Sequence, residues 1–333
     1  MAAKFLKLQN WTSLNFCIKS YSLAPKNMST YAPKGCMAAP FTPFTKDGKD
    51  VDYSKFKSYA DHLQKLKIPH LFVNGTTGEG LSMTMEERIK TAELWMQQKD
   101  KFESILLHIG TGNLKDSIQL ASHAESIGVD GIACIAPSFF RANNEESVVS
   151  YMKEVADAAP NTPFYLYDFN IMTNVYISVS RFFDLAKDEI KTLRGVKHSS
   201  PQLPSLFTGM REHRGYQFMM GTDDQYLAAL SLGSEAIVTS AFMAPYFNKI
   251  IEAFNSGDLE AARNAQEACQ KVVNVRSKYG TGPQSFAVGK SMMPMLDLDL
   301  GPVRLPLVSL TSDLAEKLQS ELKAVNFFDW VKV

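Results

Sequence analysis

A lysine follows directly on a short apolar run in the middle of the chain. The run is Leu193–Val196, and Lys197 comes next. A lysine at the end of a buried strand is partly desolvated, which lowers the pKa of its ammonium group and frees the amine to attack carbonyl carbons. The alternative is a structural lysine whose stem is buried and whose ammonium reaches the rim of the sheet. Position alone leaves both interpretations open.

A glycine-rich segment offers a second group of useful atoms. Residues 75–80 read GTTGEG and follow the apolar run His70–Val73. Closely spaced backbone N–H groups and the hydroxyls of Thr76 and Thr77 suit an anion, either a carboxylate or a phosphate. The segment lacks the GK[ST] ending of a phosphate-binding P-loop, which disfavours nucleotide binding. A glycine-rich turn that needs positive φ explains the segment equally well.

Three more polar side chains stand at the ends of apolar runs. Tyr167 ends the run Phe164–Tyr167, where it is either a core aromatic or, if it faces a lysine, a group that relays a proton. Asp223 and Asp224 follow the run Phe218–Met220. They open a predicted helix, so an N-cap explains at least one of them without any function.

The cysteines and histidines of the sequence give little support for a metal site or for disulfide bonds. The four cysteines are far apart and form no CxxC pair, and the six histidines show no HxH or HExxH spacing. We therefore predict neither a metal site nor a disulfide framework, and a reducing compartment fits best. Cys134 lies in an apolar run and is expected to be a small core residue. His70 and His108 also lie in apolar runs and are expected to be hydrogen-bonded core residues.

The elements that must position these residues alternate regularly. Eight short apolar runs are separated by stretches with apolar residues at three- and four-residue spacing. Asp52 and Thr84 are predicted N-caps, and Glu87 completes a capping box with Thr84. The apolar runs are Cys36–Ala39, His70–Val73, Ile105–Ile109, Gly131–Ala136, Phe164–Tyr167, Leu193–Val196, Phe218–Met220 and Ala236–Val238. The clearest helical stretches are Tyr53–Lys65, Glu86–Gln98, Lys115–Ile127, Glu145–Ala158 and, as the eighth helix, Pro245–Phe254.

Eight strands that alternate with helices predict parallel pairing and closure into a barrel. An open doubly wound sheet is the alternative, but no GxGxxG motif follows the first strand. We predict an α/β fold, a (β/α)8 TIM barrel at residues 35–255, with a C-terminal helical appendage at residues 256–333. The expected helices of the appendage are Leu259–Lys278, Gln284–Met293 and Ser312–Ala324. In such a barrel, reactive groups gather where the strands end.

Composition narrows the class of protein further. The chain has 333 residues, 45% hydrophobic and 21% charged, an ordinary balance for a globular protein. Lys+Arg and Asp+Glu are both 35, so no net field favours nucleic acid or an anionic membrane. No apolar run is long enough to span a bilayer.

Residues 1–34 form a leader that contains neither an acidic residue nor an arginine. The absence of acidic residues fits a mitochondrial transit peptide, whereas the absence of arginine does not. We favour an untargeted, disordered leader, or an over-long start whose true first residue is Met28. The expected location is therefore cytoplasmic, and mitochondrial if the leader is a transit peptide.

The order of these motifs resembles a known family. GTTGE, then a tyrosine, then a lysine in GVKHSS, then GTDD is similar to the dihydrodipicolinate synthase/N-acetylneuraminate lyase superfamily. The similarity runs from about residue 35 to residue 330. Within the superfamily the chain looks most like the animal N-acetylneuraminate lyase branch, and residues 71–82, 131–137 and 301–307 are the most similar stretches.

The resemblance implies a class I (Schiff-base) aldolase that cleaves N-acetylneuraminate to N-acetylmannosamine and pyruvate. Lys197 would form an imine with the substrate ketone, and Tyr167 would help remove the hydroxyl proton. Thr76 and Thr77 would hold the carboxylate. The resemblance implies no metal or organic cofactor beyond that imine, a small-molecule 2-keto acid sugar as the partner, and a homotetramer. The other positions that it implies for substrate binding are Ser199, Gly221, Asp223, Asp224 and Ser240.

Four departures from the family pattern bear on the substrate. Synthases carry an arginine where this chain has Met172, and an apolar side chain cannot pair with a second carboxylate, so the lyase interpretation gains. Asp168 beside the tyrosine is unusual and is expected to raise the tyrosine pKa or to contact substrate. Phe242 and Met243 are expected to replace polar groups near the sugar. Phe139 takes the place of a tyrosine that in many members reaches a neighbouring subunit's site.

Two other functions stay open at this point. One is a related pyruvate-dependent aldolase that acts on another 2-keto acid, motivated by the segment Asp168-Phe169-Asn170 and by the pair Phe242 and Met243. The other is a catalytically idle barrel retained for binding, which the intact lysine and tyrosine disfavour.

Overall fold

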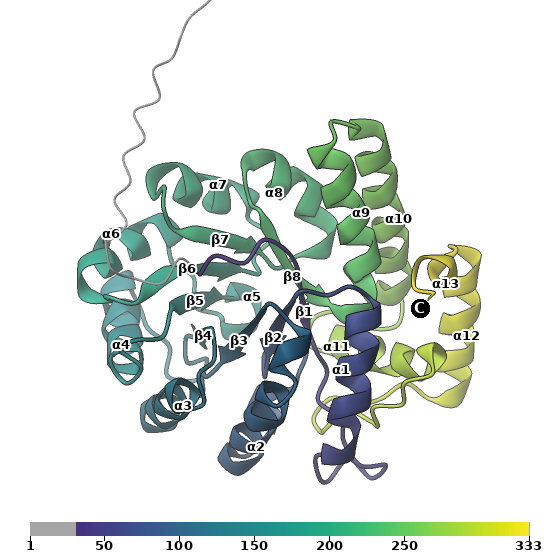
Figure 1. Cartoon of the computed structure of the whole chain (residues 1–333), viewed down its shortest axis with the longest axis horizontal. Coiled ribbons are helices and arrows are strands. Elements are labelled where there is room, and N and C mark those ends of the chain that lie inside the picture. The colour runs from purple at the N-terminus through teal and green to yellow at the C-terminus, as the bar shows by residue number, and fades with distance from the viewer. Residues whose placement is uncertain (1–30, 333) are drawn as a thin grey trace, which may run out of the picture.

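The computed structural model describes residues 31–332 of the chain. Parallel strands pair in chain order and close on themselves, with β8 beside β1 (Figure 1). The predicted TIM barrel is therefore confirmed, and the open sheet is excluded. The strands are β1 Gly35–Ala39, β2 His70–Val73, β3 Ser104–His108, β4 Gly131–Ile135, β5 Phe164–Asp168, β6 Leu193–His198, β7 Gln217–Met220 and β8 Ala236–Ser240.

Helices surround the barrel and continue beyond it (Figure 1). Each predicted helix is found, with ends that differ from the prediction by no more than about one turn. The α-helices of the described part are α1 Phe56–Lys65, α2 Met85–Met96, α3 Leu114–Ser126, α4 Glu145–Asp157, α5 Asn170–Thr173, α6 Val179–Glu189, α7 Leu203–Glu212, α8 Tyr226–Leu232, α9 Ala244–Asn255, α10 Leu259–Ser277, α11 Gln284–Met292, α12 Ser312–Ala324 and α13 Phe327–Trp330. Six short 3-10 helices add turns at the ends of these elements: η1 Tyr53–Lys55, η2 Gly80–Ser82, η3 Lys99–Lys101, η4 Asp223–Gln225, η5 Ala241–Met243 and η6 Met293–Leu296.

Both predicted caps are present. The side chain of Asp52 accepts a hydrogen bond from the backbone N–H of Ser54 at the start of η1. At α2, Thr84 accepts from the backbone N–H of Glu87, and the Glu87 carboxylate accepts from the backbone N–H of Thr84. This reciprocal pair satisfies two N–H groups that a helix end otherwise leaves unpaired.

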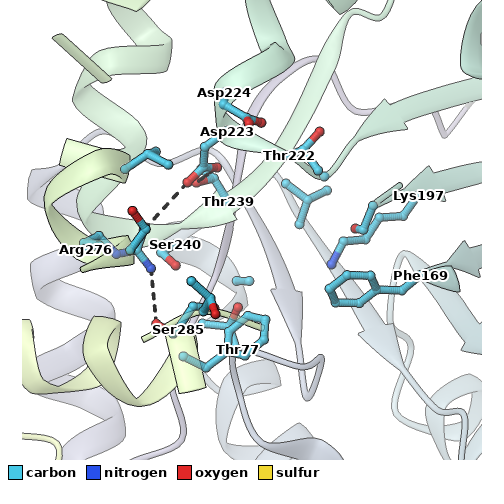
Figure 2. Close-up of a pocket in the computed structure, with 18 of the residues that line it drawn as sticks. Thr77, Phe169, Lys197, Thr222, Asp223, Asp224, Thr239, Ser240, Arg276 and Ser285 are labelled. Atoms are coloured by element: carbon cyan, nitrogen blue, oxygen red, sulfur yellow. Dashed lines mark hydrogen bonds and ion pairs between the residues drawn. The ribbon is translucent and has the colours of Figure 1, made fainter. Parts of the chain in front are cut away.

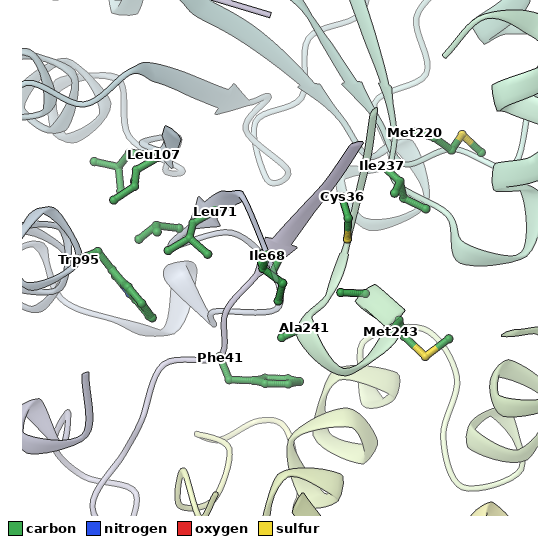
Figure 3. Close-up of a cluster of buried hydrophobic side chains, with 14 of the residues drawn as sticks. Cys36, Phe41, Ile68, Leu71, Trp95, Leu107, Met220, Ile237, Ala241 and Met243 are labelled. Carbon is green, nitrogen blue, oxygen red and sulfur yellow. The ribbon is translucent and has the colours of Figure 1, made fainter. Parts of the chain in front are cut away.

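Period-two alternation along the strands divides the core into two layers. Inward side chains such as Tyr165 and Tyr167 of β5 fill the barrel interior, while Phe164 and Leu166 point outward to the helices. The outer layer includes Leu71, Leu107 and Trp95 (Figure 3). Trp95 packs edge-on against Phe56 and Tyr59. Packing on both faces explains why these strands are continuous apolar runs.

The register of neighbouring strands brings residues distant in sequence together. Tyr167 of β5 is paired with Lys197 of β6, and Asp168 is paired with His198. Because paired residues of parallel strands point to the same face, Tyr167 and Lys197 share the interior and Asp168 and His198 share the exterior. Lys197 lies within β6 rather than beyond it, since the strand extends to His198.

The chain beyond α9 packs back on the barrel. α10 contacts α9 and η4, and α11 and α12 contact α10 (Figure 1). The predicted C-terminal helices are thus confirmed, whereas the domain limits at residues 34 and 255 stay predictions. The interpretation of the leader falls almost entirely outside the described residues. Within residues 31–332, no helix is both long enough and apolar enough to cross a membrane.

Candidate active site

Lys197 lies in the barrel interior and is only 5% exposed. Its Nζ is 3.8 Å from the centre of the Phe72 ring and 4.0 Å from the centre of the Tyr167 ring. Burial among these aromatic rings disfavours the ammonium form and holds the pKa of Lys197 well below its usual range. The direction agrees with the prediction from strand position. An amine whose pKa is lowered in this way loses its proton more readily and can then attack carbonyl carbons.

Tyr167 is the interior neighbour of Lys197. Its hydroxyl lies 3.0 Å from Oγ1 of Thr76, and its ring stacks on Phe169 with the ring centres 5.8 Å apart. Burial raises the pKa of the phenol, and hydrogen bonds with Thr76 and Ser199 offset only part of that rise. The phenol therefore stays protonated at neutral pH. It can pass a proton along a hydrogen-bonded chain, but it does not rest as a phenolate base.

The glycine-rich segment is held in place by long-range contacts. Glu79 adopts φ +52° and forms a buried ion pair with Lys290, with Oε1 and Nζ 2.8 Å apart. The interpretation that the glycines need positive φ is wrong, because Asn74 and Glu79 are the residues with positive φ here. Gly80 is needed for another reason, since an added Cβ would lie 1.9 Å from the carbonyl oxygen of Asn74. The segment is a tight turn whose shape is set by close backbone approach.

A cavity of about 270 Å³ opens at the carboxyl ends of the strands. Lys197 and Phe169 lie at one end of it, and Arg276 and Ser285 lie at the other (Figure 2). Eight of the residues predicted for the site line this cavity. They are Thr77, Tyr167, Lys197, Ser199, Gly221, Asp223, Asp224 and Ser240. The ninth, Thr76, lines an adjacent cavity of about 230 Å³ and reaches the first one through its contact with Tyr167.

Asp223 has defined partners in the cavity wall. Its Oδ1 accepts a hydrogen bond from Oγ1 of Thr239 at 2.6 Å, and its Oδ2 is 3.9 Å from Nη1 of Arg276. Burial raises the pKa of the Asp223 carboxyl, and the charge of Arg276 and the Thr239 hydroxyl oppose that rise. The N-cap interpretation is wrong, because Thr222 precedes η4 and neither aspartate caps it. Both aspartates line the cavity, and Asp223 is held there by Thr239 and Arg276.

Gly221 directly follows β7, where the chain passes close to the end of β6. An added Cβ at this position would lie 2.1 Å from Oγ of Ser199, which follows β6. Only glycine lets the backbone after β7 pass so close to this hydroxyl. A larger residue at position 221 would displace Ser199, which also lines the cavity.

Asp168 lines neither of the two cavities described above, contrary to one of the two roles considered for it. It is buried on the outer face of β5, and its Oδ2 is 2.7 Å from Nδ1 of His198. The physical reason is the alternation of the strand, which sends Asp168 outward because Tyr167 points inward. Its charge contributes to the raised pKa of Tyr167, as a smaller cause than burial.

The prediction for Phe242 and Met243 is also wrong. Both are completely buried in η5, and the Phe242 ring stacks on Phe41 and meets Phe327 edge-on. Met243 belongs to the layer between strands and helices (Figure 3). The chain turns away from the cavity after Ser240, so neither side chain lines the cavity, and Phe242 packs behind Arg276 of its wall.

Met172 and Phe139 occupy the surroundings of the site. Met172 lines the adjacent cavity, together with Thr76 and His108. Phe139 is 84% exposed and packs edge-on against Phe140, which is exposed to the same extent. His70 and His108 are hydrogen-bonded core residues, as predicted, through Ser104 and the carbonyl oxygen of Asn74.

Sequence reasoning missed the contribution of the C-terminal helices. Arg276 of α10 and residues of the α10–α11 connection form the cavity wall opposite Lys197 (Figure 2). It also missed Phe72, whose ring packs against Nζ of Lys197. The missed residues that line the cavity from this connection and from α11 are Gly280, Thr281, Ser285 and Phe286.

Metal ligands are not clustered in the described part of the chain. Within residues 31–332, no group of three or more His, Cys, Asp or Glu side chains is arranged to hold a metal ion. Cys36, Cys134 and Cys269 are free and buried, and Cys134 is a core residue, as predicted.

Comparison with known proteins gives consistent matches. A sequence model of the dihydrodipicolinate synthetase family matches residues 32–325. The N-acetylneuraminate lyase of Rattus norvegicus is 36% identical over 304 residues, which cover 89% of this chain and 94% of the relative. The solved structure of Proteus mirabilis N-acetylneuraminate lyase has a TM-score of 0.83 at 31% identity, covering 89% of this chain and 99% of its own. A catalytic-lysine mutant of Ruminococcus gnavus sialic acid aldolase has a TM-score of 0.81 at 25% identity, covering 88% and 95%.

Proposed function

The chain belongs to the dihydrodipicolinate synthetase family, and we propose that within it the protein is a class I aldolase that cleaves N-acetylneuraminate to N-acetylmannosamine and pyruvate. The observation that carries the proposal is the placement of Lys197. Its amine is buried in the barrel interior, beside Tyr167 and at one end of the cavity. The lyases named above share the fold and nearly the whole length of this chain.

The reaction begins with attack of the Lys197 amine on the C2 ketone of the open-chain sugar acid. Loss of water from the carbinolamine gives a protonated imine, which withdraws electrons from C3. The lowered pKa of Lys197 supplies the unprotonated amine, and the aromatic surroundings exclude the water that would stabilise the ammonium. The nucleophile thus needs no separate base to activate it.

Cleavage of the C3–C4 bond follows. The bonding electrons move toward the imine nitrogen and leave an enamine, while the C4 hydroxyl loses its proton and becomes the aldehyde of N-acetylmannosamine. Tyr167 relays that proton, accepting it as its own phenolic proton passes to the substrate carboxylate. The raised pKa of Tyr167 fits this role, because the phenol begins and ends the step protonated. Protonation of the enamine at C3 and hydrolysis of the imine release pyruvate and restore Lys197.

The remaining predicted residues bind the substrate. Thr76 and Thr77 hold the carboxylate through hydroxyl and backbone N–H donors, close to the Tyr167 hydroxyl. Ser199 lies beside the same hydroxyl, where it supports the relay. The side of the cavity that leads away from Lys197 binds the hydroxylated tail of the sugar through Gly221, Asp223, Asp224 and Ser240.

The other substrates considered lose most of their support. The position of the synthase arginine is Met172 in this chain, and a thioether cannot pair with a second carboxylate. The case for an aldolase with another 2-keto acid rested on residues 168–170 and on the pair Phe242 and Met243. Asp168, Phe242 and Met243 line neither cavity beside Lys197, so the case now rests on Phe169, which lines the larger one.

We also propose the wider setting of the enzyme. The covalent imine supplies the electron sink, so the reaction is expected to need no metal or organic cofactor. A homotetramer is supported by the exposed side chains of Phe139, Phe140 and Leu305, which suit burial against another subunit. A cytoplasmic location fits the three free cysteines of the described part.

The test is release of pyruvate from N-acetylneuraminate, measured for the wild type and for Lys197→Ala. We expect the wild type to release pyruvate and K197A to release none above background. Release by K197A at the wild-type rate would contradict the mechanism, and no release by the wild type would contradict the substrate.

A further inference from the structure

Arg276 is the charged side chain at the end of the cavity opposite Lys197 (Figure 2). It comes from α10, outside the eight-stranded barrel, and its side chain is only 13% exposed. Its guanidinium lies 5.1 Å from the centre of the buried Phe242 ring, which fixes one face of the group. The other contacts are with polar atoms of the cavity wall.

The guanidinium has more donors than partners. Nη2 donates to the carbonyl oxygen of Ser285 at 3.4 Å, and Nη1 is 3.9 Å from Oδ2 of Asp223. The first is a long hydrogen bond and the second is an ion pair beyond hydrogen-bond distance. Nε is buried without a hydrogen-bond partner in the described structure. An arginine carries five N–H donors, and buried donors without acceptors cost free energy, so this arrangement suits a ligand that supplies acceptors.

The surroundings of Arg276 define the chemistry of that ligand. Asp223 offers a carboxylate already held by Thr239, and Asp224 adds a second carboxylate on the same wall (Figure 2). Two carboxylates beside one guanidinium disfavour an anionic group. A pair of adjacent hydroxyls fits, because each hydroxyl accepts from the guanidinium and donates to a carboxylate. Ser240 and Thr281 line the same region and add hydroxyls of their own.

We propose that Arg276 is a specificity-determining residue that donates hydrogen bonds to the terminal hydroxyls of the substrate's tail, while Asp223 accepts from them. The inference rests on the proposed function and extends it. It assigns recognition of the tail to a residue of the C-terminal helices, in addition to the residues at the strand ends. α10 then takes part in selecting long hydroxylated substrates over short 2-keto acids.

The experiment compares a substrate that has the tail with one that lacks it. The variant is Arg276→Met, which keeps the apolar contact with Phe242 and removes the donors. The control is Arg263→Met, the same exchange at an exposed position of α10 that does not line the cavity. Each protein is assayed for kcat/KM with N-acetylneuraminate and with an analogue shortened by its last two hydroxylated carbons. Borohydride trapping of the pyruvate imine gives a third readout that is independent of the tail.

We expect R276M to lower kcat/KM for N-acetylneuraminate by about 10- to 100-fold, mainly through KM, as loss of hydrogen bonds from a charged donor does. The shortened analogue and pyruvate trapping should change by less than about threefold, a difference that corresponds to well under one hydrogen bond. R263M should match the wild type in all three assays.

Equal losses on both substrates and in trapping would show a structural role and overturn the inference, and so would unchanged kcat/KM for N-acetylneuraminate. Neither of these results would contradict the proposed function, provided that the wild type cleaves N-acetylneuraminate. A wild type that traps pyruvate but does not cleave N-acetylneuraminate overturns the proposed substrate and this inference with it.

Discussion

The buried ion pair between Glu79 and Lys290 allows a quantitative prediction. Both side chains are 1% exposed, and the pair joins the glycine-rich segment to α11 across 211 residues of sequence. Glu79 also accepts the backbone N–H of Arg304 at 2.8 Å. Lys290→Met would remove the cation of this ion pair. The Glu79 carboxylate would stay buried and would keep the hydrogen bond from the Arg304 N–H. The methionine side chain still fits against the ring of Phe44, which Nζ of Lys290 now contacts.

Loss of one partner of a buried ion pair costs about 3–5 kcal/mol of unfolding free energy. The hydrogen bond from Arg304 stays, so we expect the lower end, about 3 kcal/mol. A chain of this size has an unfolding entropy of roughly 0.6 kcal/mol/K, which converts the loss into a Tm about 5 °C lower. The double variant E79Q/K290M removes both charges and should regain most of that Tm. Because Glu79 fixes the segment of Thr76 and Thr77, K290M should also raise the KM for N-acetylneuraminate.

Thermal unfolding followed by circular dichroism measures these differences. The matched control is Lys249→Met, which breaks an exposed ion pair with Glu252 and should cost no more than about 0.5 kcal/mol. The reasoning fails if K290M unfolds within about 1 °C of the control, a gap of well under 1 kcal/mol. It fails too if the double variant is no more stable than K290M.

Three further outcomes are expected. Tyr167→Phe should lower kcat by about 100- to 10,000-fold, as loss of a proton relay does. Borohydride should still trap the pyruvate imine at a rate similar to that of the wild type. Loss of trapping would show that the phenol is needed for imine formation instead. Lys197→Met should be more stable than the wild type at neutral pH. Burial holds the pKa of Lys197 well below its unfolded value, so the lysine must give up a proton on folding, or be buried charged, and either costs stability. The stability of the wild type should then rise with pH, from the lowered pKa of Lys197 up to about 10.4, the pKa of an unfolded lysine. Denaturant titrations at several pH values should show that K197M loses its stability advantage over that range. A constant difference in unfolding free energy would contradict the lowered pKa of Lys197. Gly221→Ala should abolish cleavage, because the added methyl group meets Oγ of Ser199; full activity would show that the cavity floor is not rigid.

The fold was predictable because its signals are local and repeated. Each strand is a short apolar run, and each such run is followed by a helical pattern, so the alternation needs no long-range information. Parallel closure then sends all carboxyl ends to one rim, which is why Lys197, Tyr167 and Asp223 could be expected to share a site. The structure brings these three side chains to one cavity.

The errors have distinct physical causes. Asp168 was considered for substrate contact although the alternation of β5, anchored on Tyr167, directs it outward. That signal was present in the sequence. The burial of Phe242 was not, because it depends on the turn into η5 and on rings contributed by Phe41 and Phe327. The positive φ of Glu79 likewise depends on Lys290 and Arg304, which lie more than 200 residues away.

Arg276 shows the limit of reasoning from strand ends. Nothing local distinguishes it from the other charged residues of α10, such as Arg263. It reaches the cavity because α10 packs on η4 and α9, a contact between segments that no pattern within α10 encodes.

The central claim is that Lys197 forms an imine with a 2-keto acid. The most direct measurement is incubation with pyruvate and borohydride, followed by mass spectrometry of the proteolytic peptides. We predict a reduced pyruvyl adduct on the peptide that contains Lys197 and no adduct in K197A. An adduct on another lysine, or equal modification of K197A, would contradict the account.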